Sequence, residues 1–218
     1  MRRNLSELDA RRLLAGAPVL LVTTRWHGVD NVMPVAWSTP LSHEPPLLGI
    51  AVHPSRHTYD MIRFSEEFAL NFPSRRLMNH VQYLGIVSGR DVQKIEVTKL
   101  PTFKAQRVGA PLLEGCLAWV ECTVEDILRL GDHHLFVGKV LAVQVEREAF
   151  EEAWLLTEDD LKPLHYLGGD LYAILGERQQ AKLRTTDEGA IELEETAEER
   201  ERQEEEEALR REQEQQEQ

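Results

Sequence analysis

Several features are missing from this chain of 218 residues, and each absence excludes a class of protein. With only two cysteines, the chain cannot be held together by a disulfide framework. The longest apolar stretches, such as residues 47–52, have the length of a strand rather than of a membrane-spanning helix. The first residues include acids and lack the apolar segment of a secretory signal. We therefore expect a cytoplasmic protein that does not enter a membrane.

The two cysteines, Cys116 and Cys122, fall within one predicted strand. Alternate side chains of a strand share a face, and six extended residues span about 20 Å, which is too far for a disulfide bond. We expect both to be buried, reduced side chains on the same face of the strand.

Common nucleotide and metal motifs are absent as well. The chain has no G-x-x-x-x-G-K-[ST] or G-x-G-x-x-G, so a nicotinamide would bind only transiently and not by the Rossmann route. Ser88 lies in Ser-Gly-Arg-Asp, which is not a nucleophile elbow. Because the cysteines do not form a C-x-x-C pair, no metal site is evident.

Negative charge is concentrated at the C-terminal end. Residues 188–218 contain 14 acidic and 4 basic residues, which leaves 24 acidic and 21 basic residues in the rest of the chain. The nearly neutral body has no basic stripe for nucleic acid. We expect one domain over residues 1–180, followed by an acidic Glu/Gln/Arg-rich tail over 181–218 that is either helical or disordered.

Alternation of apolar and polar residues predicts a mainly β domain with a few helices, in the α+β class. Gly28 and the Gly131-Asp132 pair indicate hairpin turns, and Gly138 inside a strand indicates a bulge or a close approach of another group. Such antiparallel strands favour a closed or partly closed barrel with helices at its mouth. We expect strands at 18–24, 31–37, 47–52, 67–72, 119–127 and 134–145, and helices at 5–15, 58–65 and 75–84.

The aromatic segment 164–175 contains Gly168-Gly169, which is too short and too poorly placed for a dinucleotide fingerprint. We expect this segment to close the domain or to pack on a partner subunit.

Two chain segments offer a cradle for a phosphorylated, planar ligand. Small side chains followed by hydroxyls end the strand at Val35-Ala36-Trp37-Ser38-Thr39, so a ligand can approach the backbone. Ser55-Arg56-His57-Thr58 lies between the strand 47–52 and a predicted helix. Backbone N–H groups at a helix N-terminus favour an anion, and Arg56 adds a bidentate donor. Taken alone, these residues favour an ordinary strand end and an ordinary helix cap over a ligand site.

At these residues the chain resembles the flavin reductase-like family, the FMN-binding split β-barrels that include the flavoredoxins. The resemblance extends over about residues 15–145. It is carried by Asn31 to Tyr59, Phe68-Ala69-Leu70-Asn71-Phe72-Pro73, Gly85 to Asp91, Glu121-Cys122 and Gly131 to Val140. It implies a Greek-key-like antiparallel split barrel, bound FMN, and a homodimer with the flavin site near the subunit interface.

The resemblance also implies roles for individual residues. Ala36, Trp37, Ser38 and Thr39 would line the flavin ring, and Ser55, Arg56, His57 and Thr58 would bind its phosphate. Further cofactor-binding residues would be Asn71, whose amide can turn toward the pocket, and the turn residues Ser88, Gly89, Arg90 and Lys94.

We expect an NAD(P)H-dependent flavin oxidoreductase in which hydride passes directly between stacked rings. The candidate catalytic residue is His133, which could contact the nicotinamide or stabilise reduced flavin. It could equally be a turn histidine bonded to Asp132. Two alternatives are a flavoredoxin-like carrier, reduced by a redox partner protein, and a non-catalytic interaction protein. The sequence does not separate FMN from FAD, or NADH from NADPH.

Overall fold

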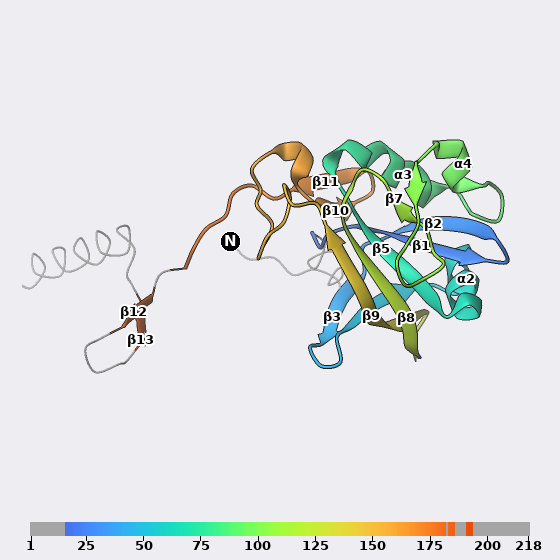
Figure 1. Ribbon diagram of the computed structural model, residues 1–218, viewed down its shortest axis with the longest axis horizontal. Helices are drawn as coiled ribbons and strands as arrows, with labels where there is room; N and C mark the ends of the chain where they lie inside the picture. The colour runs from blue at the N-terminus through green and yellow to red at the C-terminus, as the bar shows by residue number, and fades with distance from the viewer. Residues whose placement is uncertain (1–15, 182, 186–190, 194–218) are drawn as a thin grey trace, which may run out of the picture. The chain divides into compact units, whose positions relative to one another are not determined.

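The computed structural model describes residues 16–181, 183–185 and 191–193 (Figure 1). Contacts divide the chain into two units, residues 1–177 and 178–218, and each is described by itself. The helix expected at residues 5–15 lies outside the described residues. Among those that are described, no helix is both long and apolar enough to span a membrane.

The first unit is built on a seven-stranded antiparallel sheet, which confirms the mainly β prediction (Figure 1). Its strands follow the spatial order β2-β1-β5-β8-β9-β4-β3. Their bounds are β1 Leu20–Trp26, β2 Val29–Val35, β3 Ser38–Ser42, β4 Leu47–Val52, β5 Glu67–Pro73, β8 Cys116–Leu130 and β9 His133–Val145. Strand β3 begins where the sequence predicts only a strand end.

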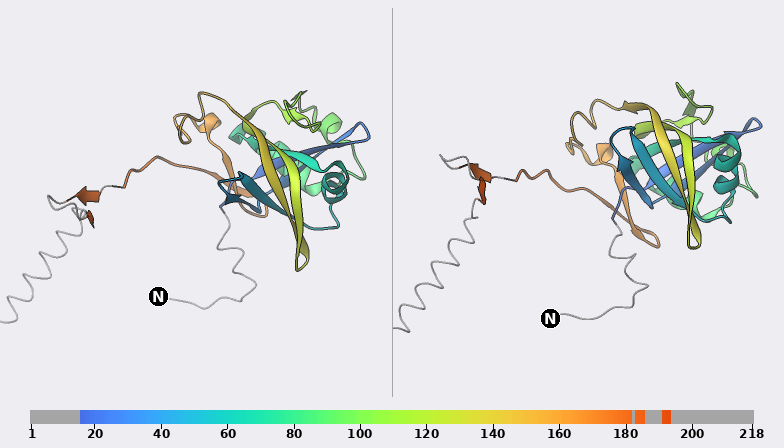
Figure 2. Two further views of the ribbon diagram at one scale, coloured as in Figure 1. Left: turned by 60° about the horizontal axis from the view of Figure 1, so that its bottom comes forward. Right: turned by 90° about the horizontal axis from the view of Figure 1, so that it is seen from below.

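The connection between β2 and β3 closes this sheet into a barrel. The two strands lie at opposite edges of the sheet, yet only Ala36 and Trp37 separate them along the chain. Seven flat strands would place the edges about 29 Å apart, whereas the step from Val35 to Ser38 spans at most about 11 Å. The sheet must therefore curl (Figure 2). At the seam, the Ala51 N–H donates to the Trp37 carbonyl over 2.9 Å.

The barrel interior is packed with aliphatic and aromatic side chains, of which Ile50, Phe68 and Phe136 are fully buried. Gly138 faces this interior. A Cβ at that position would lie 2.5 Å from Cζ of Phe68 and 3.0 Å from Cβ of Cys122. The close approach predicted from the sequence is therefore present, and the missing side chain at Gly138 makes room for the Phe68 ring.

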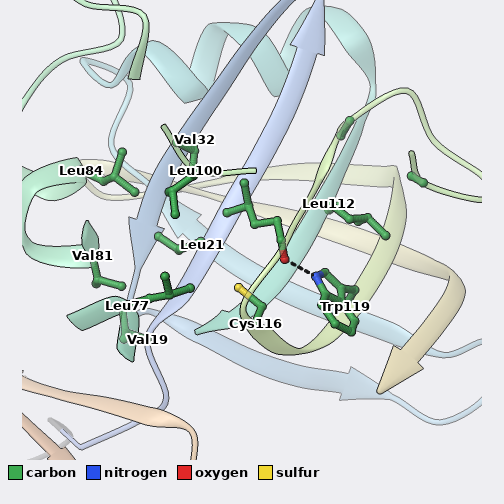
Figure 3. Close-up of a cluster of buried hydrophobic side chains, with 14 of the residues drawn as sticks. Val19, Leu21, Val32, Leu77, Val81, Leu84, Leu100, Leu112, Cys116 and Trp119 are labelled. Carbon is green, nitrogen blue, oxygen red and sulfur yellow. Dashed lines mark hydrogen bonds between the residues drawn. The ribbon is translucent and has the colours of Figure 1, made fainter. Parts of the chain in front are cut away.

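A second core lies on the outside of the sheet, beneath helices that lie together at the top of Figure 1. The covering elements are η2 Arg75–Leu77, α3 Met78–Ile86, α4 Lys94–Thr98 and the short pair β6 Thr102–Phe103 and β7 Leu112–Leu113. Figure 3 shows Val81 and Leu84 of α3 pointing toward Leu21 and Val32 of the sheet. The indole N–H of Trp119 donates to the Leu113 carbonyl over 2.9 Å, so its one polar atom is satisfied within the core (Figure 3).

The two cysteines lie on opposite faces of β8, contrary to the sequence expectation. Cys116 belongs to the outer core and Cys122 to the barrel interior. The pairing of β5 with β8 shifts register between Phe72 and Pro73, and this bulge reverses the alternation of faces beyond Ala118. Both are buried free thiols. Burial raises the pKa of Cys116 and raises that of Cys122 to about 12, so neither is a thiolate at neutral pH.

Strand β8 is buried on both faces along its first half, and Glu121 is the charged residue in this buried stretch. Its carboxylate accepts hydrogen bonds from the backbone N–H groups of Gln106, Arg107 and Val108. These bonds fix the loop that covers the outer core, since a buried carboxylate is tolerated only when it is fully hydrogen-bonded.

The remaining elements are shorter. Helix α2, His57–Ser65, follows β4, and η3 covers Asp159–Leu161. The aromatic segment forms a hairpin of β10, Leu164–Gly168, and β11, Leu171–Ile174, and its first strand bridges to Pro18. In the second unit, β12 Leu183–Thr185 pairs with β13 Ile191–Leu193. Most of the acidic tail that we expect to be helical or disordered lies outside the described residues.

Gly138→Ala is expected to destabilise the protein by about 1–3 kcal/mol, because the added methyl group overpacks the barrel against Phe68. Gly176→Ala is the matched control, since a Cβ there meets nothing within 4 Å. Chemical denaturation of both variants measures the difference. Equal stability of the two would show that the interior adapts to the methyl group without strain.

Candidate functional site

Two cavities meet at the barrel seam and share Ala36, Trp37 and Ala51 in their walls. The first cavity has a volume of about 690 Å³ and reaches from the seam to the N-terminus of α2 and the C-terminal end of α3. The second cavity, of about 700 Å³, lies between the seam and the β10–β11 hairpin. Each has the size of a small-molecule or cofactor site.

The N-terminus of α2 forms one wall of the first cavity. Arg56 is its N-cap residue, in extended conformation, and no side chain caps the helix. The first N–H groups of a helix have no partner within it, so this end offers donors and a partial positive charge to an anion. The exposed Arg56 guanidinium lines the same cavity and makes no hydrogen bond or ion pair with another described residue.

The turn before this helix is held by His53. Its Nδ1 accepts a hydrogen bond from the Ser55 N–H over 3.1 Å and lies 2.8 Å from the Ser55 hydroxyl. Because the N–H can only donate, Nδ1 carries no proton, and the Ser55 hydroxyl donates to it as well. His53 therefore sets the conformation of the predicted phosphate turn.

Lys94 brings a second cation to the first cavity from α4. Only 4% of its surface is exposed, and its ammonium group donates to the Leu84 carbonyl over 2.7 Å. Burial and then the nearby charge of Arg56 lower the pKa of Lys94 to about 8. An anion in the cavity would favour the charged form of this lysine.

The neighbouring side chains fix the backbone of the turn. Burial, followed by the positive charge of Arg90, lowers the pKa of His57, so this imidazole is neutral at pH 7. The Thr58 hydroxyl accepts a hydrogen bond from the buried Asn31 amide over 2.8 Å. A Cβ on Gly89 would clash with Asn31 and His57, so the turn at Ser88 and Gly89 approaches α2 only because residue 89 is glycine.

Two predicted cofactor-binding residues are placed elsewhere. Asn71 is fully buried in the outer core, where its amide donates to the Leu21 carbonyl and accepts from the Leu113 N–H, each over 2.8 Å. Its side chain points into the protein and not toward the cavity. Arg90 donates to the Ser55 carbonyl and pairs with Asp60 at 2.7 Å, so it braces the turn rather than lining the cavity.

Aromatic rings gather where the seam meets the turn between β8 and β9. Trp37 is 47% exposed, and its ring centroid lies 4.7 Å from that of His133. The His133 ring lies 5.2 Å from the His53 ring, and its Nδ1 is 2.7 Å from the Asp132 carboxylate. That hydrogen bond lowers the pKa of Asp132. His133 thus has both its predicted partner in the turn and a place in the cavity wall.

The second cavity receives the two hydroxyl residues predicted for the flavin ring. Ser38 and Thr39 line it together with Leu135 and the hairpin residues Tyr166 to Gly169. Among the described residues, no charged side chain lines this second cavity, whereas Arg56 and Lys94 line the first. The predicted ring-binding and phosphate-binding groups therefore meet at the seam but face spaces of different polarity.

Sequence reasoning missed two residues that organise this site. His53 and Asn31 both lie in the segment that carries the family resemblance, but their partners, Ser55 and Thr58, could be identified only from the fold. The described residues contain no group of three or more His, Cys, Asp or Glu side chains arranged to hold a metal ion.

Comparison with known proteins identifies the family to which this chain belongs. The model of the flavin reductase like domain matches residues 12–174, and the chain belongs to this family. Its fold is the FMN-binding split barrel predicted from the resemblance.

The protein YddH of Escherichia coli K12 is 32% identical over 177 residues, covering 79% of this chain and 94% of YddH. Two solved structures are also similar. An FMN-binding protein from Thermus thermophilus with bound p-hydroxybenzaldehyde is 30% identical, with a TM-score of 0.72, and the match covers 84% of this chain and 99% of that one. A flavoredoxin from Methanosarcina acetivorans is 26% identical, with a TM-score of 0.69, over 86% of this chain and 96% of that one.

Lys94→Met is expected to change how stability depends on pH. The pKa of Lys94 is lowered from 10.5 to about 8 in the folded protein, so between these values the unfolded chain binds more protons than the folded one. The unfolding free energy of the unmodified protein should therefore rise between pH 8 and 10.5 relative to that of Lys94→Met.

Denaturation of both proteins at pH 7.5 and pH 9.5, without added ligand, measures this difference. Lys104→Met, which removes an exposed lysine, is the control and should follow the unmodified protein. If the unfolding free energies of all three proteins changed with pH in parallel, the lowered pKa of Lys94 would be contradicted.

Proposed function

We propose that this chain binds FMN at the barrel seam and acts as an NAD(P)H-dependent flavin oxidoreductase. The observation that carries this proposal is the first cavity, in which the uncapped N-terminus of α2 faces the same space as Arg56 and the buried Lys94. A phosphate dianion fits this donor set, which combines two cations with free backbone N–H groups.

The seam suits the flavin ring. Ala36 is small and exposes backbone groups, Trp37 gives a flat apolar wall, and Ser38 and Thr39 follow as the chain enters β3. Such a wall excludes water from one side of a planar ligand, while backbone groups orient its polar edge. Bound flavin would supply the ability to accept a hydride and to pass electrons on singly or in pairs.

The chain's own residues have two tasks in this proposal. Arg56, Lys94 and the Ser55–Thr58 turn anchor the cofactor by its phosphate. His133 stands beside Trp37 in the cavity wall, with its Nδ1 held by Asp132. From there it positions the nicotinamide or stabilises negative charge on the reduced ring, and it does not act as a nucleophile. NAD(P)H is the transient cosubstrate in this proposal, because the sequence contains no Rossmann dinucleotide-binding motif.

A second candidate function is a bound-FMN electron carrier that a protein partner reduces. The similarity to a flavoredoxin favours it. Steady-state oxidation of NADH and NADPH in the presence of free FMN separates the two functions, because the carrier would show no turnover with either nucleotide. From the family resemblance, we also propose that the functional protein is a homodimer with the flavin site near the subunit interface.

Arg56→Ala is expected to weaken FMN binding by about 10- to 100-fold, since a charge-assisted hydrogen bond to phosphate contributes about 1.5–3 kcal/mol. Equilibrium dialysis and the 300–550 nm spectrum of the bound flavin measure the loss. Arg63→Ala is the matched control, because Arg63 lies in the last turn of the same helix and outside the cavity. Equal affinity in both variants, or no FMN uptake by the unmodified protein, would refute the phosphate site.

His133→Ala is expected to lower reductase turnover while FMN affinity changes little, because His133 contacts the rings of Trp37 and His53 and makes no hydrogen bond to the Ser55–Thr58 turn. His43→Ala removes an exposed histidine that lines neither cavity and serves as the control. NAD(P)H oxidation rates and dialysis with FMN measure the two properties separately. Unchanged turnover in His133→Ala would remove this residue from the chemistry.

A further inference from the structure

The second cavity extends from the barrel seam to the β10–β11 hairpin. Its outer wall is the β10–β11 hairpin, which contributes Tyr166, Leu167, Gly168 and Gly169, opposite Trp37 and Leu135. The hairpin is tied to the barrel at several points. The Tyr172 hydroxyl donates to the Gln82 side chain of α3 over 2.6 Å, and β10 bridges to Pro18. The wall is therefore built into the fold.

The chemistry of this cavity differs sharply from that of the first. In the part of the chain that the structure describes, its wall consists of glycines, alanines, two leucines, two aromatic residues and two hydroxyl residues, without a charged side chain. A charged ligand would lose hydration there without gaining a partner, whereas an apolar ligand gains by leaving water. The flat rings of Trp37 and Tyr166 favour a planar molecule.

The position of the cavity is as informative as its composition. Trp37, Ala36 and Ala51 line both spaces, so a molecule in the second cavity lies against the same residues as a ligand in the first. Ser38 and Thr39 line the second cavity but not the first. The Thr39 hydroxyl donates to the Pro40 carbonyl over 3.1 Å, and the Ser38 hydroxyl can donate to the carbonyl oxygen of a ligand.

We infer that the second cavity binds a neutral, planar, largely apolar carbonyl compound of the quinone type, which receives electrons from the flavin site. This inference rests on the proposed function, because NAD(P)H is the reductant. Overall, NAD(P)H and one proton convert the quinone into the hydroquinone and yield NAD(P)+, so two electrons and two protons are transferred.

Equilibrium dialysis of FMN-loaded protein with 2,3-dimethyl-1,4-naphthoquinone tests the inference, with 1,4-naphthoquinone-2-sulfonate as the anionic comparison. The neutral quinone is expected to bind at least about tenfold more tightly than the sulfonate, without releasing FMN. It should also be reduced when NADH or NADPH is added.

Leu167→Asp places a charge in the cavity wall at a residue that is already 47% exposed, so the fold should tolerate it. It is expected to weaken quinone binding at least about tenfold. Leu171→Asp is the matched control on the other strand of the hairpin, where the side chain is 64% exposed and lies outside the cavity wall. Its affinity for the quinone should stay within about twofold of the unmodified protein.

Three results would overturn the inference: equal binding of the neutral and anionic quinones, equal quinone affinity in both leucine variants, or release of FMN by the neutral quinone. The last would show that the flavin ring itself occupies the second cavity. Failure of the proposed function looks different. FMN would not bind, yet FMN-free protein would still take up the neutral quinone, because every residue of the cavity wall belongs to this chain.

Discussion

The closure of the sheet by two residues is the constraint on which the rest of the structure depends. Because Ala36 and Trp37 must join opposite edges of a seven-stranded sheet, the sheet has an inside and an outside, and each needs its own core. The joining residues cannot also be covered by a neighbouring strand along their whole length. The seam is therefore where the barrel is open to a ligand, and both cavities are found there.

Polarity along the seam follows from the elements that happen to end beside it. Helices α2 and α4 bring Arg56, Lys94 and free helix N–H groups to one side, and the β10–β11 hairpin brings aromatic and small apolar residues to the other. Burying Lys94 near Arg56 is unfavourable for the empty protein, as the lowered pKa of Lys94 shows. The protein tolerates this repulsion at one place, which is typical of a site shaped for an anion. The described wall of the second cavity contains no such pair of like charges, so it selects a ligand by shape and apolar area.

Much of this structure could be predicted from the sequence, and the failures have physical causes. Strand β4 matches its predicted bounds and the turns at Gly28 and Gly131 are hairpins, because alternation and glycine placement are local signals. The face of Cys116 was predicted wrongly, because a bulge depends on the pairing of β5 with β8 and not on β8 alone. Asn71 was assigned to the cavity on its neighbours in sequence, whereas its amide is used by Leu21 and Leu113, which are distant in sequence. His53 and Asn31 were missed for the same reason.

The bulge in β8 has one more consequence, which concerns oxidation. Reduced flavins react with oxygen, and a protein that holds one is exposed to the peroxide formed beside it. Cysteine is oxidised mainly as the thiolate and where it is accessible. Cys116 and Cys122 are buried in different cores, and burial keeps both protonated. Because they lie in different cores of the intact fold, these two thiols neither pair with each other nor face solvent, so they do not form a thiol switch.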